Sequence, residues 1–172
     1  MRTLRTFGWP AMAAMLLVLS GLAGQRVLAQ TATPADMSPV GIWKQIYDKT
    51  GEAKSLIQIN ETNGELTGKV LKVLKSSKGP NPLCDKCSGA LKNQPVNGME
   101  ILRGMKPDGS SWSGGTILDP KSGKTYRCDM RVIDGGAKLK VRGYIGFSLF
   151  GRTQVWLRES THVAPARSAT TE

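Results

Sequence analysis

The chain has 172 residues, with 24 Lys and Arg against 13 Asp and Glu, so its formal net charge is +11 at pH 7. This length suits one domain with a sizeable core. A single histidine, His162, stands in a polar C-terminal segment. One histidine excludes metal sites built from three histidines, and its place in that segment argues against a His-based catalytic triad.

The first 29 residues have the pattern of a secretory signal peptide. Arg2 and Arg5 give a basic start, residues 11–19 form an apolar centre, and residues 27–29 are small or apolar. The apolar centre is about half of the roughly 20 apolar residues that a membrane span requires. We therefore expect export, with cleavage after about Ala29 and no membrane-spanning segment. An uncleaved anchor is the alternative, disfavoured because proline and glycine residues interrupt the run.

Cleavage would remove three arginines and no acidic residue, leaving 21 basic and 13 acidic residues, or a net charge of +8. Such a charge attracts anionic surfaces, which in an envelope compartment are lipid head groups, lipopolysaccharide or acidic polymers. Contact with a membrane surface is therefore open, whereas nucleic acid is not an expected partner because export separates the two. The simpler alternative is that the charge keeps the protein soluble. Residues 30–38 and 160–172 are too polar to fold, so the domain is expected over 39–159.

Eight strand-like runs with tight turns fill this domain. The first five cover residues 41–48, 53–62, 65–75, 98–105 and 110–119; the sixth follows a turn at 120–123, the seventh follows a turn at 134–136, and the eighth covers 152–159. Asn63-Gly64 is a strong hairpin signal, because both residues tolerate positive φ. The apolar phase slips between Val70 and Leu71, which predicts a bulge. Gly114-Gly115 predicts a bend in the fifth strand.

The sixth, seventh and eighth runs alternate between two faces. In the sixth, one face carries Tyr126, Cys128, Met130 and Val132, and the other carries Thr125, Arg127, Asp129 and Arg131. In the seventh, Leu139, Val141 and Ile145 oppose Lys138, Lys140 and Arg142. In the eighth, Val155 and Leu157 oppose Gln154, Trp156 and Arg158. This period of two favours strands with one buried and one solvated face.

Short strands with tight turns predict antiparallel pairing. Eight such strands can close into an up-and-down barrel whose interior is filled by side chains or holds one small ligand. Closure also removes the exposed strand edges that promote aggregation. The expected fold class is all-β, a single antiparallel barrel of about eight strands, with an open two-layer sandwich as the alternative.

Several strings carry a resemblance to a known family. They are Gly41-Ile42-Trp43, Gly98-Met99-Glu100-Ile101-Leu102, Trp112 to Pro120, Gly123-Lys124-Thr125-Tyr126, Val141 to Gly146, and Gly151 to Trp156. Together they resemble the DUF2147 family of exported bacterial proteins over about residues 40–159. The resemblance implies a lipocalin-like barrel in the periplasm of a Gram-negative bacterium. The family has no established function, so the resemblance implies no activity.

A looser resemblance is to the lipocalins, whose first strand carries Gly-x-Trp and whose last strand carries an Arg that packs across that indole. Gly41 and Trp43 fit the first feature, and Arg158 is the candidate for the second. The resemblance implies a cation–π contact between Arg158 and Trp43 that closes one barrel end. The alternative is a core tryptophan and a solvated arginine.

Cys84 and Cys87 form a Cys-x-x-Cys motif in a Pro- and Gly-rich connection at residues 76–96, and Cys128 is the third cysteine. Export favours a structural disulfide. A Cys84–Cys87 ring would stabilise the fold by roughly 2 kcal/mol, and a link from either residue to Cys128 by roughly 4 kcal/mol, on a loop-entropy model. The sequence leaves the pairing open. A redox-active pair would lack the strand–helix scaffold of thioredoxin-type sites, and a zinc site would lack a full ligand set.

The sixth and seventh runs carry the candidate binding residues. If the barrel is hollow, their apolar face would line a pocket, and if it is filled they are core. The candidate ligand contacts are Tyr126, Met130, Val132, Leu139, Val141 and Ile145. The opposite face carries Arg127, Arg131, Lys138, Lys140 and Arg142, a basic face that could meet an anionic envelope component. A solvated sheet face is the simpler explanation of the same pattern.

These patterns favour a periplasmic lipocalin-like protein that binds a small, lipophilic ligand in or at the mouth of the barrel. The alternative is an envelope structural or interaction module that binds an anionic partner, and a thiol–disulfide redox protein comes third. Asp108, Asp119 and Asp134 stand at turns and are typical turn formers. The sequence therefore shows no catalytic constellation, and we expect no enzyme activity, cofactor or metal.

Overall fold

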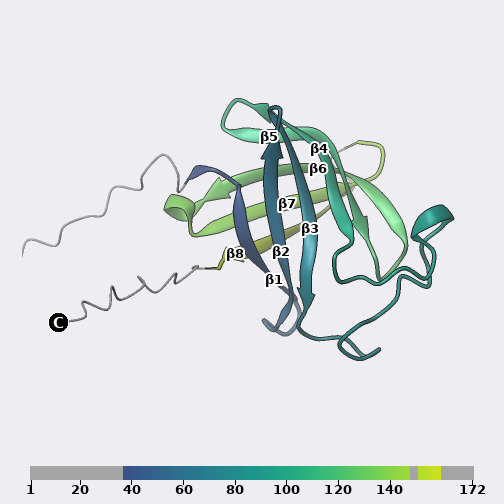
Figure 1. Ribbon diagram of the computed structural model, residues 1–172. Coiled ribbons are helices and arrows are strands. Elements are labelled where there is room, and N and C mark those ends of the chain that lie inside the picture. The colour runs from purple at the N-terminus through teal and green to yellow at the C-terminus, as the bar shows by residue number, and fades with distance from the viewer. Residues whose placement is uncertain (1–36, 148–150, 160–172) are drawn as a thin grey trace, which may run out of the picture. The chain divides into compact units, whose positions relative to one another are not determined.

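The computed structural model describes residues 37–147 and 151–159. The expected signal peptide at 1–29, nearly all of the leader at 30–38 and the tail at 160–172 lie outside these residues. The described part forms eight antiparallel strands that follow one another around a closed barrel, in the order β1 to β8 (Figure 1). The all-β, up-and-down barrel expected from the sequence is confirmed, and the open sandwich is excluded.

The strands are β1 (Gly41–Ile46), β2 (Ala53–Thr62), β3 (Glu65–Val73), β4 (Glu100–Asp108), β5 (Ser111–Asp119), β6 (Lys124–Ile133), β7 (Lys138–Tyr144) and β8 (Gly151–Arg158). Two short 3₁₀ turns, η2 (Gly89–Leu91) and η3 (Asp134–Gly136), lie between them. The main difference from the expected bounds is in β4, which was predicted to stop at Met105 but continues through Pro107. This is possible because β4 pairs with β3 no further than Met105, so the missing N–H of Pro107 removes no ladder bond there.

The predicted bulge in β3 is present. Leu56 of β2 pairs with Lys72 and Ile57 pairs with Val70, so Leu71 has no partner in the ladder. The extra residue restores the alternation, and Val70 is buried while Leu71 is 42% exposed. The apolar slip in the sequence therefore marks a change of register and not a change of fold.

The predicted bend at Gly114-Gly115 is also present, as a register shift between β5 and β6. Gly114 has a φ of +76°, which L side chains rarely adopt. A Cβ on Gly115 would lie 2.4 Å from both the Arg103 carbonyl oxygen and the Met105 sulfur. The pair therefore combines a backbone turn with a close approach of β5 to β4.

One end of the barrel is filled with large side chains. The ladder places Trp156 opposite Leu139, and Leu139 opposite Val132, at one level of the barrel. All three are almost completely buried, as are Trp43 and Met130. Two indoles and several branched side chains thus fill this end of the barrel, consistent with a barrel of this size.

Arg158 covers this filled end. Its guanidinium carbon lies 4.2 Å from the centre of the Trp43 ring, a cation–π geometry. Arg158 Nε donates to the Gly136 carbonyl oxygen at 2.6 Å, and an Nη donates to the Ser38 carbonyl oxygen at 2.6 Å. Trp43 Nε1 donates to the Pro39 carbonyl oxygen at 2.7 Å. The arginine therefore ties together the segment before β1, the η3 turn and the end of β8.

The inward face of β7 differs from the expectation in one place, and the structure shows which face of β8 points inward. Ile145 was expected on the inner face with Leu139 and Val141, but it lies beyond the end of β7 and is 60% exposed. In β8 the apolar Val155 and Leu157 point outward, whereas Trp156 is fully buried. The inner face of β8 therefore carries Trp156 and also a polar side chain, Gln154.

The long connection between β3 and β4 is held against the β5–β6 turn. A Cys84–Cys87 disulfide, with a Cα–Cα distance of 5.3 Å, closes a short ring in it. Cys84 Sγ lies 3.3 Å from the Pro120 carbonyl oxygen. A Cβ on Gly123 would lie 1.9 Å from the Lys86 carbonyl oxygen, so a glycine is required there. The Cys84–Cys87 disulfide ring thus packs directly against the β5–β6 turn.

Candidate functional site

A cavity of about 1150 Å³ opens at the end of the barrel opposite the Trp43–Arg158 closure. Its lining residues come from the inner faces of the strands and from the connection between β3 and β4. Small-molecule sites commonly occupy roughly 300–1,000 Å³, so the space would accept a ligand of ordinary size. The barrel is therefore filled at one end and hollow at the other.

One side of this cavity is a polar wall, formed by Gln45 of β1, Ser55 of β2 and Gln154 of β8. Gln45 Nε2 donates to Gln154 Oε1 at 3.0 Å, and Ser55 Oγ donates to Gln45 Oε1 at 2.8 Å. Trp156 Nε1, which belongs to the filled end, donates to Gln154 Oε1 at 3.3 Å. The network joins three strands across the seam at which the barrel closes, and these bonds fix the side-chain orientations.

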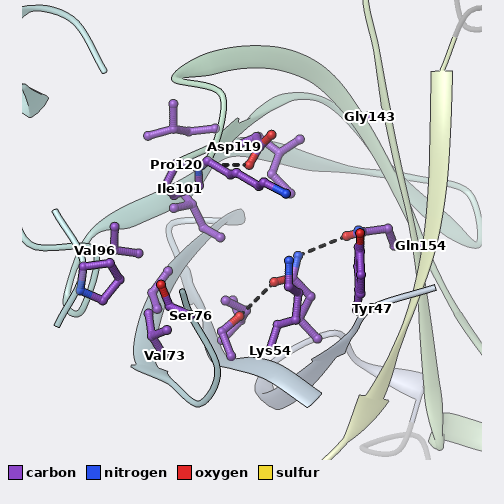
Figure 2. A pocket seen from close by; sticks show the side chains of 18 of the residues that line it. Tyr47, Lys54, Val73, Ser76, Val96, Ile101, Asp119, Pro120, Gly143 and Gln154 are labelled. Carbon is purple, nitrogen blue, oxygen red and sulfur yellow. Dashed lines mark hydrogen bonds between the residues drawn. The ribbon is translucent and has the colours of Figure 1, made fainter. Parts of the chain in front are cut away.

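An apolar wall lies across the cavity from Gln154. Figure 2 shows Val73, Val96 and Ile101 on one side of the pocket, with Tyr47 and Gln154 on the other. Val73 ends β3, Val96 belongs to the long connection, and Ile101 is in β4. Asn97 holds that connection to the sheet by accepting a 2.7 Å hydrogen bond from the Val73 N–H. A ligand would therefore meet an apolar surface on one side and hydrogen-bonding groups on the other.

The mouth of the cavity carries seven basic and three acidic residues. They are Lys49, Lys54, Lys75, Lys78, Lys86, Lys121 and Arg152, against Glu52, Asp85 and Asp119. Lys75 pairs with Glu52 and lowers the pKa of that carboxyl group, and Lys78 does the same for Asp85. Lys54 Nζ lies 4.3 Å from the centre of the Tyr47 ring. The excess of positive charge at the mouth makes its potential favourable to anions.

The six ligand contacts hypothesised from the sequence divide between the two ends of the barrel. Tyr126, Val141 and Ile145 line the cavity, with Ile145 at its exposed mouth. Met130, Val132 and Leu139 are at most 2% exposed, do not line the cavity, and pack within the filled part. A single face of β6 and β7 therefore serves as core at one end and as cavity wall at the other.

The basic face expected on β6 and β7 lies on the outside of the barrel. Its members are Arg127, Arg131, Lys138, Lys140 and Arg142. Arg131 and Lys140 stand directly opposite each other and are exposed. Lys138 forms a 2.6 Å ion pair with Asp134, and Arg142 donates to a threonine hydroxyl of β8 at 3.0 Å. Arg131 and Lys140 are therefore the two members of this face whose positive charges lie directly opposite each other.

The structure resolves the cysteine pairing that the sequence leaves open, because Cys84 is bonded to Cys87 and Cys128 is a buried free thiol. Cys128 lies four residues along β6 from Lys124, which is roughly 13 Å at about 3.3 Å per residue. Cys84 packs against the β5–β6 turn, close to the start of β6. It is therefore too far from Cys128 for a disulfide, which needs Cα atoms within roughly 7 Å. Burial, followed by the charge of Asp129, raises the pKa of Cys128 to about 12. Cys128 is therefore a protonated core residue.

The polar wall was not predicted from the sequence. Gln45 and Gln154 each stand two residues from a buried tryptophan on the same strand, and Ser55 stands two residues from buried Ile57. The period of two thus placed all three on the inner face, and this signal was available in the sequence. The three residues were not predicted to point inward, because glutamine and serine side chains are usually exposed to solvent.

Residues 37–147 and 151–159 contain no group of three or more His, Cys, Asp or Glu side chains that could hold a metal ion. Within the same ranges, no helix has the length and apolar character needed to cross a membrane. The candidate site is the cavity at the open end of the barrel.

Comparisons with known proteins agree with this architecture. The solved structure described as "Protein HP1028 from the human pathogen Helicobacter pylori belongs to the lipocalin family" is similar to this chain with a TM-score of 0.63 and 19% sequence identity. The match covers 73% of this chain and 85% of that chain, and at this identity it shows the fold alone. No curated protein matches the sequence. The model of a family described as "Uncharacterized protein conserved in bacteria (DUF2147)" matches residues 41–158. The chain therefore belongs to the DUF2147 family and has a lipocalin-like barrel.

Proposed function

We propose that this protein is exported to the periplasm and binds a small, largely apolar ligand in the open end of its barrel. The observation that carries the proposal is the cavity of about 1150 Å³ beside a filled barrel end. A barrel needs no such cavity for its own stability, because unfilled apolar space removes packing contacts. The neighbour described as a lipocalin supports a binding role by analogy of fold. Export rests on the signal-like pattern of residues 1–29.

The direct test is native mass spectrometry of the protein purified from the periplasm of its own host. A co-purifying small molecule released by organic solvent is the expected result. A second measurement uses the neutral fluorescent probe N-phenyl-1-naphthylamine, which should bind with an increase in fluorescence. No released molecule and no binding of the probe would together contradict the proposal.

A pair of Val→Trp variants would locate the binding. Val73 lies on the apolar wall, so Val73→Trp fills part of the cavity and should weaken binding of the probe by about 10-fold or more. Val155 points outward from β8 and is 36% exposed, so Val155→Trp is the matched control and should leave binding unchanged. Equal effects of the two variants would show that the probe binds elsewhere.

A second candidate function rests on the outer basic face. Like charges directly opposite on neighbouring strands destabilise a sheet, so the exposed Arg131–Lys140 pair favours an anionic partner that would relieve the repulsion. The prediction is salt-sensitive retention on lipopolysaccharide or acidic lipid, lost in the variant Lys138→Ala, Lys140→Ala, Arg142→Ala. Retention that does not change with salt or with these substitutions would dismiss it. A thiol–disulfide activity is less favoured, because Cys84 is 0% and Cys87 is 4% exposed.

A further inference from the structure

We infer that the cavity selects amphipathic ligands with an anionic oxygen group, such as a carboxylate, which is bound by the free amide of Gln154 on the polar wall. This inference rests on the proposed binding function and adds the chemical class of the ligand. Three features of the cavity point to this ligand class: the direction of the hydrogen bonds in the polar wall, the charge at the mouth, and the position of the apolar wall.

The direction of the hydrogen bonds follows from Trp156. An indole N–H can donate but cannot accept, so the Gln154 atom that faces Trp156 Nε1 must be the amide oxygen. The same oxygen is 3.0 Å from Gln45, which must therefore present its NH₂ group. The Gln45 oxygen is then left to accept from Ser55 Oγ, at 2.8 Å. One donor-only side chain thus orients the whole network.

This orientation leaves donors without acceptors. Gln154 Nε2 has two N–H groups, and among the described residues neither has a hydrogen-bond partner, while Gln45 Nε2 uses one N–H for Gln154. In the same part of the chain, every fully buried side-chain N or O atom has a partner, so Gln154 Nε2 is not sealed in the protein. Gln154 lines the cavity. The polar wall therefore offers N–H groups to whatever occupies the cavity, and a ligand that displaces water from them must supply an acceptor to avoid a loss of affinity.

The charge at the mouth decides between a neutral and an anionic acceptor. Seven basic residues stand against three acidic ones, and two of those acids, Glu52 and Asp85, are already paired with lysines. Arg152 is paired with a fourth acid, Asp48, and the balance stays positive. In the described part of the chain, Lys49, Lys86 and Lys121 at the mouth form no ion pair. An anionic group is therefore attracted by the mouth and hydrogen-bonded by the polar wall, and a cationic group is opposed by both.

The rest of the ligand would lie against the apolar wall of Val73, Val96 and Ile101, on the side of the pocket away from Gln154 (Figure 2). An apolar chain with a terminal carboxylate satisfies both walls at once. A purely apolar molecule would leave the Gln154 amide without water or partner, at a cost in affinity.

The test compares three ligands of equal chain length, decanoate, decanol and decylammonium, by calorimetry at low salt. The wild-type protein should bind decanoate about 10-fold or more tightly than decanol, and decylammonium most weakly. The variant Gln154→Glu keeps an oxygen for Trp156 and Gln45 and replaces the free NH₂ with a carboxylate oxygen. It should weaken decanoate binding by about 10-fold or more, change decanol by no more than about 3-fold, and strengthen decylammonium binding.

The matched control is Gln58→Glu, which adds the same charge to β2 at a position between inward-facing Ile57 and Ile59 and thus on the outer face. It should leave the order of the three ligands unchanged. Equal affinity of the wild-type protein for decanoate and decanol would overturn the inference, and that comparison does not depend on any variant folding. If decanol and the neutral probe bind but decanoate has no advantage, the proposed function stands and this inference fails. If none of these ligands binds, both fail.

Discussion

Replacement of Arg158 by methionine should destabilise the barrel much more than loss of an ordinary surface arginine. Methionine keeps the apolar stem of the side chain but removes the cation–π contact with Trp43, at 4.2 Å, which is worth about 0.5–2 kcal/mol. It also removes the charged hydrogen bonds to the carbonyl oxygens of Gly136, Ser38 and Val40, at 2.6, 2.6 and 3.2 Å. Each bond contributes about 1 kcal/mol at a partly exposed site, and the contributions are not additive. The expected loss in the free energy of unfolding is about 2–4 kcal/mol.

Urea titration followed by tryptophan fluorescence and by circular dichroism would measure this loss. The matched control is Arg152→Met, because Arg152 is exposed and pairs with Asp48 at 2.6 Å at the other end of the barrel. An exposed ion pair contributes about 0–1 kcal/mol, so this variant should stay close to the wild type. Equal midpoints for the two variants would refute the view that Arg158 closes the barrel.

Three further predictions concern stability. The pKa of Cys128 is raised from 9.0 to about 12, so the stabilising effect of the neutral thiol is complete below pH 9 and is lost as the pH rises toward 12. The free energy of unfolding should thus fall by up to about 1.4 kcal/mol per pH unit above pH 9, a slope that should be absent in Cys128→Ala when both proteins are titrated with urea. Gly115→Ala would place a Cβ 2.4 Å from the Arg103 carbonyl oxygen, and it should cost about 2 kcal/mol or more by the same assay, against little change if the strands can move apart. Cys84→Ser with Cys87→Ser should cost about 2 kcal/mol and leave the strand signal in circular dichroism intact, and a loss of that signal would show that the ring is needed for the barrel to form.

Most of the barrel follows from local patterns in the sequence. Asn63-Gly64 and the alternation in β6 specify a turn and a face from a few neighbouring residues, and both are read without knowing the rest of the fold. The apolar slip after Val70 specifies its bulge in the same way. Such features are predictable because the period of the strand and the chemistry of the turn act over short distances.

The parts that were missed depend on contacts between distant strands. Pro107 can remain in β4 because it lies beyond Met105, the last residue of β4 that pairs with β3. The sequence of β4 does not reveal where this pairing stops. Gln154 could face inward because Gln45, from the first strand, supplies its hydrogen bond. The cysteine pairing depends on where the long connection meets the β5–β6 turn. Each is set by tertiary neighbours and overrides the local preference of the residue.

The position of the polar wall links ligand binding to the completion of folding. β1 and β8 are the strands furthest apart in the chain, and they pair over Trp43–Gln45, whereas β7 and β8 pair over Lys138–Tyr144. Contacts of large sequence separation carry the greatest loop-closure cost and tend to form late. Gln45 and Gln154 lie on these two strands, so the hydrogen bond that orients the polar wall exists only while β1 and β8 are paired. A ligand bound to the polar wall would then stabilise the β1–β8 pair against local opening. Amide hydrogen exchange should slow more in these two strands than elsewhere in the barrel.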